Sequence, residues 1–139
     1  MAKGSNPNRG KTEQSQHDKM VKIIAKHYYT NGYQVKADHI GWPDGSPAAI
    51  NSHIPDVVAV FGSNTNSPDK KIIEVETCGT YADQHTKEQL KAFTKDHSAT
   101  VYLFVPPECY IQAKQQVHKW GLQRVMVGYC NTMTGLVRV

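Results

Sequence analysis

The spacing of apolar residues predicts a long amphipathic helix near the start of the chain. Val21, Ile24 and Tyr28 recur at the three-and-four spacing of one buried helix face, with Met20 beside them. An Asn-Gly pair ending at Gly32 follows, and these residues favour the left-handed backbone of a helix cap. The pattern therefore predicts a helix from residue 12 or 14 to residue 30.

Two short apolar runs predict a pair of central strands. Residues 54–61 are apolar except for an acid at Asp56, and residues 70–77 alternate, so that Glu74 and Glu76 point to the same side. Both runs are rich in β-branched residues, and Gly, Asn, Ser and Pro fill the break between them, which is typical of a hairpin. The continuous apolar character of the first run predicts a strand that is covered on both faces.

The rest of the pattern completes an α/β chain. The further elements predicted are a weak strand at 33–38, a loop at 39–53, a helix at 86–97, a strand at 100–105, a helix at 107–121, and strands at 124–129 and 136–139. Thr86 and Gln89 fit a capping box at the start of the second helix. A meander of three strands followed by a strand-helix-strand crossover predicts a mixed sheet with helices on both faces.

Composition favours a single-domain protein of the cytoplasm. The length of 139 residues is that of one domain, and no apolar run approaches the roughly 20 residues of a membrane helix. The polar N-terminus lacks the apolar segment of a secretory signal. Cys78, Cys109 and Cys130 are odd in number and lack a CxxC spacing, so we expect reduced thiols rather than disulfides or a zinc site.

The formal net charge of +4 is unevenly placed along the chain. Lys3, Arg9 and Lys11 precede any acidic residue, so residues 1–11 are predicted to form a flexible basic arm, followed by one domain at residues 12–139. Such an arm suits electrostatic contact with nucleic acid. A solvated terminus without a partner is the alternative interpretation.

Three acids should meet where the two central strands lie side by side. Asp56, Glu74 and Glu76 are predicted to converge, and carboxylates held close together repel one another unless a cation lies between them. A hard divalent ion such as Mg²⁺ takes carboxylate, backbone carbonyl and water ligands, and can activate water for attack on a phosphate. A solvated strand face is the alternative for Glu74 and Glu76.

Pro55-Asp56 and Glu74-Val75-Glu76, with the order of elements around them, resemble the motifs of the PD-(D/E)XK nuclease superfamily. Archaeal-type Holliday junction resolvases and restriction-endonuclease-like proteins are the nearest members in layout. The resemblance implies a restriction-endonuclease-like fold, in which a mixed sheet with an α-β-β-β-α-β core is flanked by helices. The sequence departs from the family at Glu76, which stands where a Lys is usual. Because Glu76 adds negative charge there, we expect the site to need a metal ion more strongly.

The resemblance also implies roles for individual residues. Asp56, Glu74 and the backbone carbonyl of Val75 would hold Mg²⁺, for which Mn²⁺ could substitute. Glu76 would hold a second ion or take the proton from water. Glu13 would join the site, because Gly10-Lys11-Thr12-Glu13 resembles the Gly-Lys-x-x-Glu pattern of resolvase-like members, with one residue fewer before the acid.

Other residues near the motifs have two interpretations each. Gln89 resembles a glutamine that many members use to hold the phosphate or the water, but a capping role would also explain it. Lys87 could supply positive charge near the scissile phosphate, or could lie on a solvated helix face. His53 and His85 flank the acidic segments and are expected to be polar loop residues, since Mg²⁺ prefers oxygen ligands.

The function expected from the resemblance is that of a Mg²⁺-dependent endonuclease that hydrolyses phosphodiester bonds in DNA. Cutting both strands requires two sites, so a homodimer is expected, with an interface near Trp120 or the terminal strands. The alternative is a catalytically inactive nuclease-fold module that binds nucleic acid or a protein partner. A nucleotide-binding domain is less favoured, because Gly-rich phosphate loops are absent from the sequence.

Overall fold

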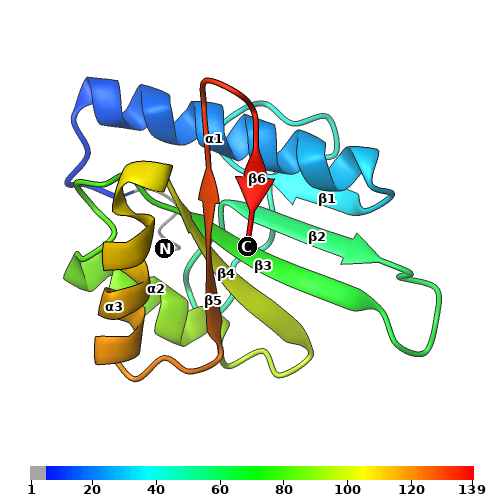
Figure 1. Ribbon diagram of the computed structural model, residues 1–139. Coiled ribbons are helices and arrows are strands. Elements are labelled where there is room, and N and C mark those ends of the chain that lie inside the picture. Colours follow the sequence, from blue (N-terminus) through cyan, green and yellow to red (C-terminus); the bar gives the residue numbers. More distant parts are fainter. Residues whose placement is uncertain (1–5) are drawn as a thin grey trace.

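The computed structural model describes residues 6–139, and the elements in this range follow the predicted order (Figure 1). Their bounds are Lys11–Thr30 (α1), Gln34–Ala37 (β1), Val57–Phe61 (β2), Asp69–Val75 (β3), Gln84–Phe93 (α2), Ala99–Val105 (β4), the 3-10 turn Pro107–Cys109 (η1), Tyr110–Lys119 (α3), Val125–Cys130 (β5) and Val137–Arg138 (β6). None of these helices combines the length and the apolar character that crossing a membrane requires.

The strands form one curled, mixed sheet in the order β1-β2-β3-β4-β5-β6. The first three strands are an antiparallel meander, β3, β4 and β5 run parallel, and β6 returns antiparallel to β5. The crossovers between parallel strands carry α2 and then η1 with α3, as parallel pairing requires. The predicted α/β class and the order helix, three strands, helix, strand are confirmed.

Helices cover both faces of the sheet, and each face has its own core (Figure 1). On one face, Met20 and Ile24 of α1 pack against the strands. On the other face, Phe93 of α2 and Val117 of α3 belong to the second core. Adjacent residues of β3 enter opposite cores, Ile72 facing α2 and α3 and Ile73 facing α1. This alternation follows from the two-residue period of a strand.

The predicted amphipathic helix is confirmed, with one polar residue on its buried face. The stripe that α1 buries consists of His17, Met20, Val21, Ile24, Ala25 and Tyr28. The helix begins at Lys11, slightly before the predicted start, and ends at Thr30. Gly32 follows with a φ of +91°, a conformation that costs glycine little and other residues more.

Strand β2 is not covered on both faces, so that prediction is wrong. Val57 and Ala59 are buried under α1, but Val58 and Val60 are only half-buried and Phe61 is 51% exposed. The reason is that α2 and α3 pack over β3, β4 and β5, whereas β2 lies next to the edge strand β1. Apolar residues on the outer side of β2 therefore remain partly in contact with solvent.

The predicted capping box at the second helix is also wrong. Helix α2 begins at Gln84 with Asp83 as its N-cap and ends at Phe93. Thr86 lies within the helix and is buried, and its hydroxyl donates to the Thr80 carbonyl oxygen at 2.8 Å. Thr86, Gln89 and Phe93 share the buried face of α2, and this packing sets the register of the helix.

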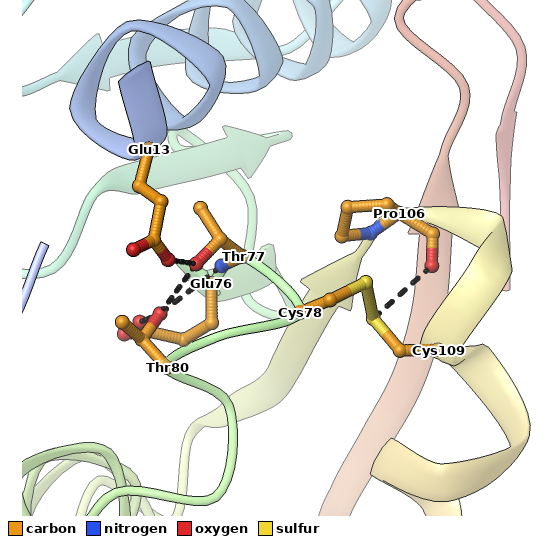
Figure 2. Close-up of a disulfide and its surroundings, with 7 residues drawn as sticks. All are labelled: Glu13, Glu76, Thr77, Cys78, Thr80, Pro106 and Cys109. Atoms are coloured by element: carbon orange, nitrogen blue, oxygen red, sulfur yellow. Dashed lines mark hydrogen bonds between the residues drawn. A yellow bond between two sulfur atoms is a disulfide. The ribbon is translucent and has the colours of Figure 1, made fainter. Parts of the chain in front are cut away.

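A disulfide joins Cys78 to Cys109, so the prediction of reduced thiols is wrong for these two residues (Figure 2). Cys78 follows β3, and Cys109 ends the turn that follows β4. Because β3 and β4 are parallel neighbours, their carboxyl ends lie at the same edge of the sheet. The sequence separation of 31 residues gave no sign of this proximity. Cys130 is a free, buried thiol, and the cytoplasmic location stays a prediction.

Candidate functional site

The three predicted acids lie buried where β2 begins and β3 ends. Antiparallel pairing of Val57 with Ile73 brings Asp56 next to the end of β3. One carboxylate oxygen of Asp56, Oδ2, accepts a hydrogen bond from the backbone N–H of Val75 at 2.8 Å. Asp56, Glu74 and Glu76 are 1%, 2% and 0% exposed, which rules out a solvated strand face for the two glutamates.

Asp56 forms a buried ion pair with a histidine of α1. The other Asp56 oxygen, Oδ1, lies 3.1 Å from Nε2 of His17 and 3.7 Å from Nε2 of His39. Burial alone would lower the pKa of His17, but the Asp56 carboxylate outweighs it and raises that pKa above its ordinary value. In turn, burial would raise the pKa of Asp56, but His17 holds it below the usual range for aspartate. Each partner therefore favours the charged form of the other.

Glu76 forms a second buried ion pair, with an arginine that precedes α1. Nη2 of Arg9 lies 3.0 Å from Oε1 of Glu76 and also donates to the Val75 carbonyl oxygen at 3.1 Å. The Thr80 hydroxyl donates to the same Glu76 oxygen at 2.6 Å (Figure 2). Burial raises the pKa of Glu76, although the Arg9 charge and the Thr80 hydrogen bond oppose that increase. The guanidinium of Arg9 thus offsets the negative charge of Glu76.

Glu74 lies between these two ion pairs, and no ion pair of Glu74 itself is found among residues 6–139. Burial, together with the charges of Asp56 and Glu76, raises the pKa of Glu74 well above its ordinary value. Its Oε1 atom is buried and has no hydrogen-bond partner among residues 6–139. Glu74 therefore favours the protonated form, in which it shares a hydrogen bond with Asp56.

Residues 6–10 pack against the loop that precedes α2. The side-chain amides of Asn6 and Asn8 both donate to Oδ2 of Asp83, at 3.2 and 3.0 Å. The side chain of Arg9, expected in a flexible basic arm, is instead only 2% exposed. Lys11 is exposed at the start of α1. The part of the predicted arm from residue 6 onward is therefore ordered against the site.

The remaining predicted site residues are not part of the contacts described above. Lys3 lies outside the described residues, and Lys87 is half-buried on α2. Gln89 is buried, and its Oε1 atom has no hydrogen-bond partner in the described part of the chain. The rings of His53 and His85 lie 6.5 Å apart.

Glu13 reaches the loop after β3 from the first turn of α1. Its Oε2 atom accepts a hydrogen bond from the Thr77 hydroxyl at 2.7 Å, directly beside Glu76 (Figure 2). A Cβ atom at Gly79 would lie 2.4 Å from this oxygen, so a glycine makes room for the Glu13 carboxylate. The structure therefore brings Glu13 next to the acid cluster, as the resemblance implied.

Neither cation of the two buried ion pairs was predicted at the acid cluster: His17 was missed, and Arg9 was expected to contact nucleic acid. His17 lies three and four residues before Met20 and Val21, on the same helix face, so a polar residue within the apolar stripe was a usable signal. Arg9 gave no comparable signal, because its burial depends on how residues 6–10 fold back over Glu76.

The oxygen donors of the cluster have the chemistry that Mg²⁺ prefers, and Glu74 and Glu76 each keep a buried carboxylate oxygen without a partner among residues 6–139. Asp56, Glu74 and the Val75 carbonyl could hold such an ion. However, within the described residues no three His, Cys, Asp or Glu side chains are already arranged as metal ligands. Arg9 holds both the Val75 carbonyl and one oxygen of Glu76.

Comparison of the chain with protein-family models, with curated proteins and with solved structures finds no match. The resemblance to the PD-(D/E)XK superfamily therefore rests on the two motifs and on the order of the elements. The case for a function rests on the buried acid cluster itself.

Proposed function

We propose that the protein is a Mg²⁺-dependent DNA endonuclease with a restriction-endonuclease-like fold. The observation that carries this proposal is the buried carboxyl group of Glu74, which has one unpartnered oxygen beside Asp56 and Glu76. Burying such a group is costly, and strongly shifted pKa values gather at functional sites. A hard cation would give this oxygen a partner and would remove the repulsion among the acids.

The residues of the cluster have separable roles in the proposed reaction. His17 keeps Asp56 ionised, so Asp56 is ready to bind a cation together with Glu74 and the Val75 carbonyl. Glu74 must lose its proton to become a ligand. Bound Mg²⁺ supplies a Lewis acid that lowers the pKa of water and offsets charge on the phosphate.

Glu76 is the base that the geometry favours. Its Oε1 atom is held by Arg9 and Thr80, whereas Oε2 is buried without a hydrogen-bond partner in residues 6–139. Because the Thr80 hydroxyl holds Oε1, Oε2 has a defined orientation and can accept the proton of the attacking water. The raised pKa of Glu76 makes it a stronger base than an ordinary glutamate.

DNA is the proposed partner, and a homodimer would present two sites to its two strands. Lys11 is exposed at the start of α1, and Lys87 lies on α2 after the site loop. These cations, with Lys3, are proposed to contact phosphates, where counterion release would favour binding. Salt should therefore weaken binding strongly.

A second candidate is a nuclease-fold module that binds DNA or a protein partner without cutting. One observation favours it: His17 and Arg9 already provide one cation each for Asp56 and Glu76. The two ion pairs balance most of the charge that would otherwise demand a metal.

Cleavage assays separate the two candidates. Plasmid and branched DNA are incubated with the protein in Mg²⁺ or Mn²⁺, and the nuclease proposal expects products that Asp56→Asn and Glu74→Gln abolish. Asp44→Asn is the matched control, because Asp44 is an exposed acid in the loop before β2. Binding to DNA without products in either metal would reject the nuclease and favour the module.

A further inference from the structure

Arg9 occupies the oxygen atoms that a cation in the cluster would use. Its Nη2 atom donates to the Val75 carbonyl and to Oε1 of Glu76, at 3.1 and 3.0 Å. The other two guanidinium nitrogens, Nε and Nη1, are buried without a hydrogen-bond partner among residues 6–139. A structural arginine usually binds a carboxylate through two parallel hydrogen bonds. The Arg9 guanidinium is therefore buried while only one of its three nitrogens is hydrogen-bonded. Such a group is held less firmly in the cluster than a fully bonded arginine, so another cation can displace it more easily.

The side-chain hydrogen bonds that tie the segment carrying Arg9 to the rest of the described chain converge on two places, Asp83 and the end of β3. Residues 6–10, which we call the strap, are held by the amides of Asn6 and Asn8 on the single Asp83 carboxylate. The strap meets α1 at Gly10, which is exposed and would have nothing within 4 Å of an added Cβ atom. No side-chain hydrogen bond caps α1 at this point. The strap can therefore turn about Gly10 without disturbing the helix.

We propose that the strap closes the acid cluster and that a divalent cation enters by exchange with the Arg9 guanidinium. This inference rests on the proposed metal site. Exchange replaces a single positive charge by two, frees the Val75 carbonyl and Oε1 of Glu76, and offers a partner to the orphaned oxygen of Glu74. Once released, Arg9 is a mobile cation beside the site, where DNA phosphates would attract it.

The test measures Mn²⁺ affinity by calorimetry and the accessibility of the strap by limited trypsin digestion, neither of which depends on DNA cleavage. Arg9→Gln removes the competing cation, so its affinity for Mn²⁺ should be about tenfold tighter or more than that of the unmodified protein. In the unmodified protein, saturating Mn²⁺ should speed trypsin cleavage after Arg9. Lys19→Gln, which removes an exposed cation elsewhere on α1, should leave the affinity unchanged.

A second variant covers the chance that Arg9→Gln unfolds, because that change leaves Glu76 buried without its cation. Asp83→Ala removes the acceptor of both strap amides while Arg9 and the acids stay intact. It should also tighten Mn²⁺ binding and should expose the strap to trypsin without metal.

The outcomes distinguish failure of the strap from failure of the proposed function. Equal Mn²⁺ affinity in the unmodified, Asp83→Ala and folded Arg9→Gln proteins would overturn the exchange, even if DNA is cleaved. Absence of Mn²⁺ binding in all three would overturn it as well and would remove the metal site. Tighter binding in the variants without DNA cleavage in any of them would support the strap and reject the nuclease.

Discussion

Nε2 of His17 lies 3.1 Å from Oδ1 of Asp56, and neither side chain is more than 2% exposed. This pair fixes the end of α1 that lies beside the acid cluster to the start of β2. It also sets the ionisation of the cluster, because a charged Asp56 discourages ionisation of Glu74 nearby. Removing one partner of a buried ion pair leaves the other charge buried without compensation, which destabilises the fold strongly. Replacing both partners by apolar residues costs much less stability.

His17→Ala is predicted to lower the free energy of unfolding by about 3 to 5 kcal/mol, since Asp56 would remain buried without its cation. Urea denaturation of the metal-free protein measures this loss. Asp18→Asn is the control, because Asp18 contacts Nδ1 of the same histidine but is 35% exposed and should contribute little. A loss for His17→Ala no larger than that of the control would contradict a structural ion pair.

The raised pKa of Glu74 predicts how stability depends on pH without metal. A carboxyl group whose pKa is higher in the folded state binds its proton more tightly there, so it stabilises the fold below its unfolded pKa. That stability is lost as the pH rises through the folded pKa. Glu74→Gln should therefore melt close to the unmodified protein at about pH 4 and above it at about pH 8.

Thermal melts in EDTA across this pH range provide the measurement. Addition of Mg²⁺ should then stabilise the unmodified protein at the higher pH and leave Glu74→Gln unchanged, since the ligand is missing. If the melting temperatures of the two proteins differed by the same amount at every pH, Glu74 would not be the group that carries the proton.

The disulfide is predicted to stabilise the fold by about 3 to 4 kcal/mol, from the closure of a loop whose ends are 31 residues apart. Reduction with a thiol reagent should lower the free energy of unfolding by that amount in urea titrations. The double variant Cys78→Ser, Cys109→Ser should not respond to the reagent. An unmodified protein that is equally unresponsive would mean that the bond does not form.

The reduced protein should also show where the disulfide acts. Cys78 lies two residues after Glu76, at the start of the loop that carries Thr80 (Figure 2). The same loop continues to Asp83. Loss of the bond frees this loop, so trypsin should reach the strap residues 6–10 faster after reduction.

The sequence predicted the positions of Asp56 and Glu74 because strand periodicity and β-branched runs are local signals. Its failures have a different cause. The Cys78–Cys109 bond, the burial of Arg9 and the open outer face of β2 all depend on which segments pack together in three dimensions. Thr86 shows the same limit at a helix end, where tertiary burial outweighed a plausible capping pattern.

The central claim is that the acid cluster binds a divalent cation, and a crystal soaked in Mn²⁺ tests it most directly. Anomalous density should appear about 2.1 Å from carboxylate oxygens of Asp56 and Glu74 and from the Val75 carbonyl, with Arg9 moved away from that carbonyl. A fully soaked crystal without such density, with Arg9 still paired to Glu76 and His17 to Asp56, would contradict the account.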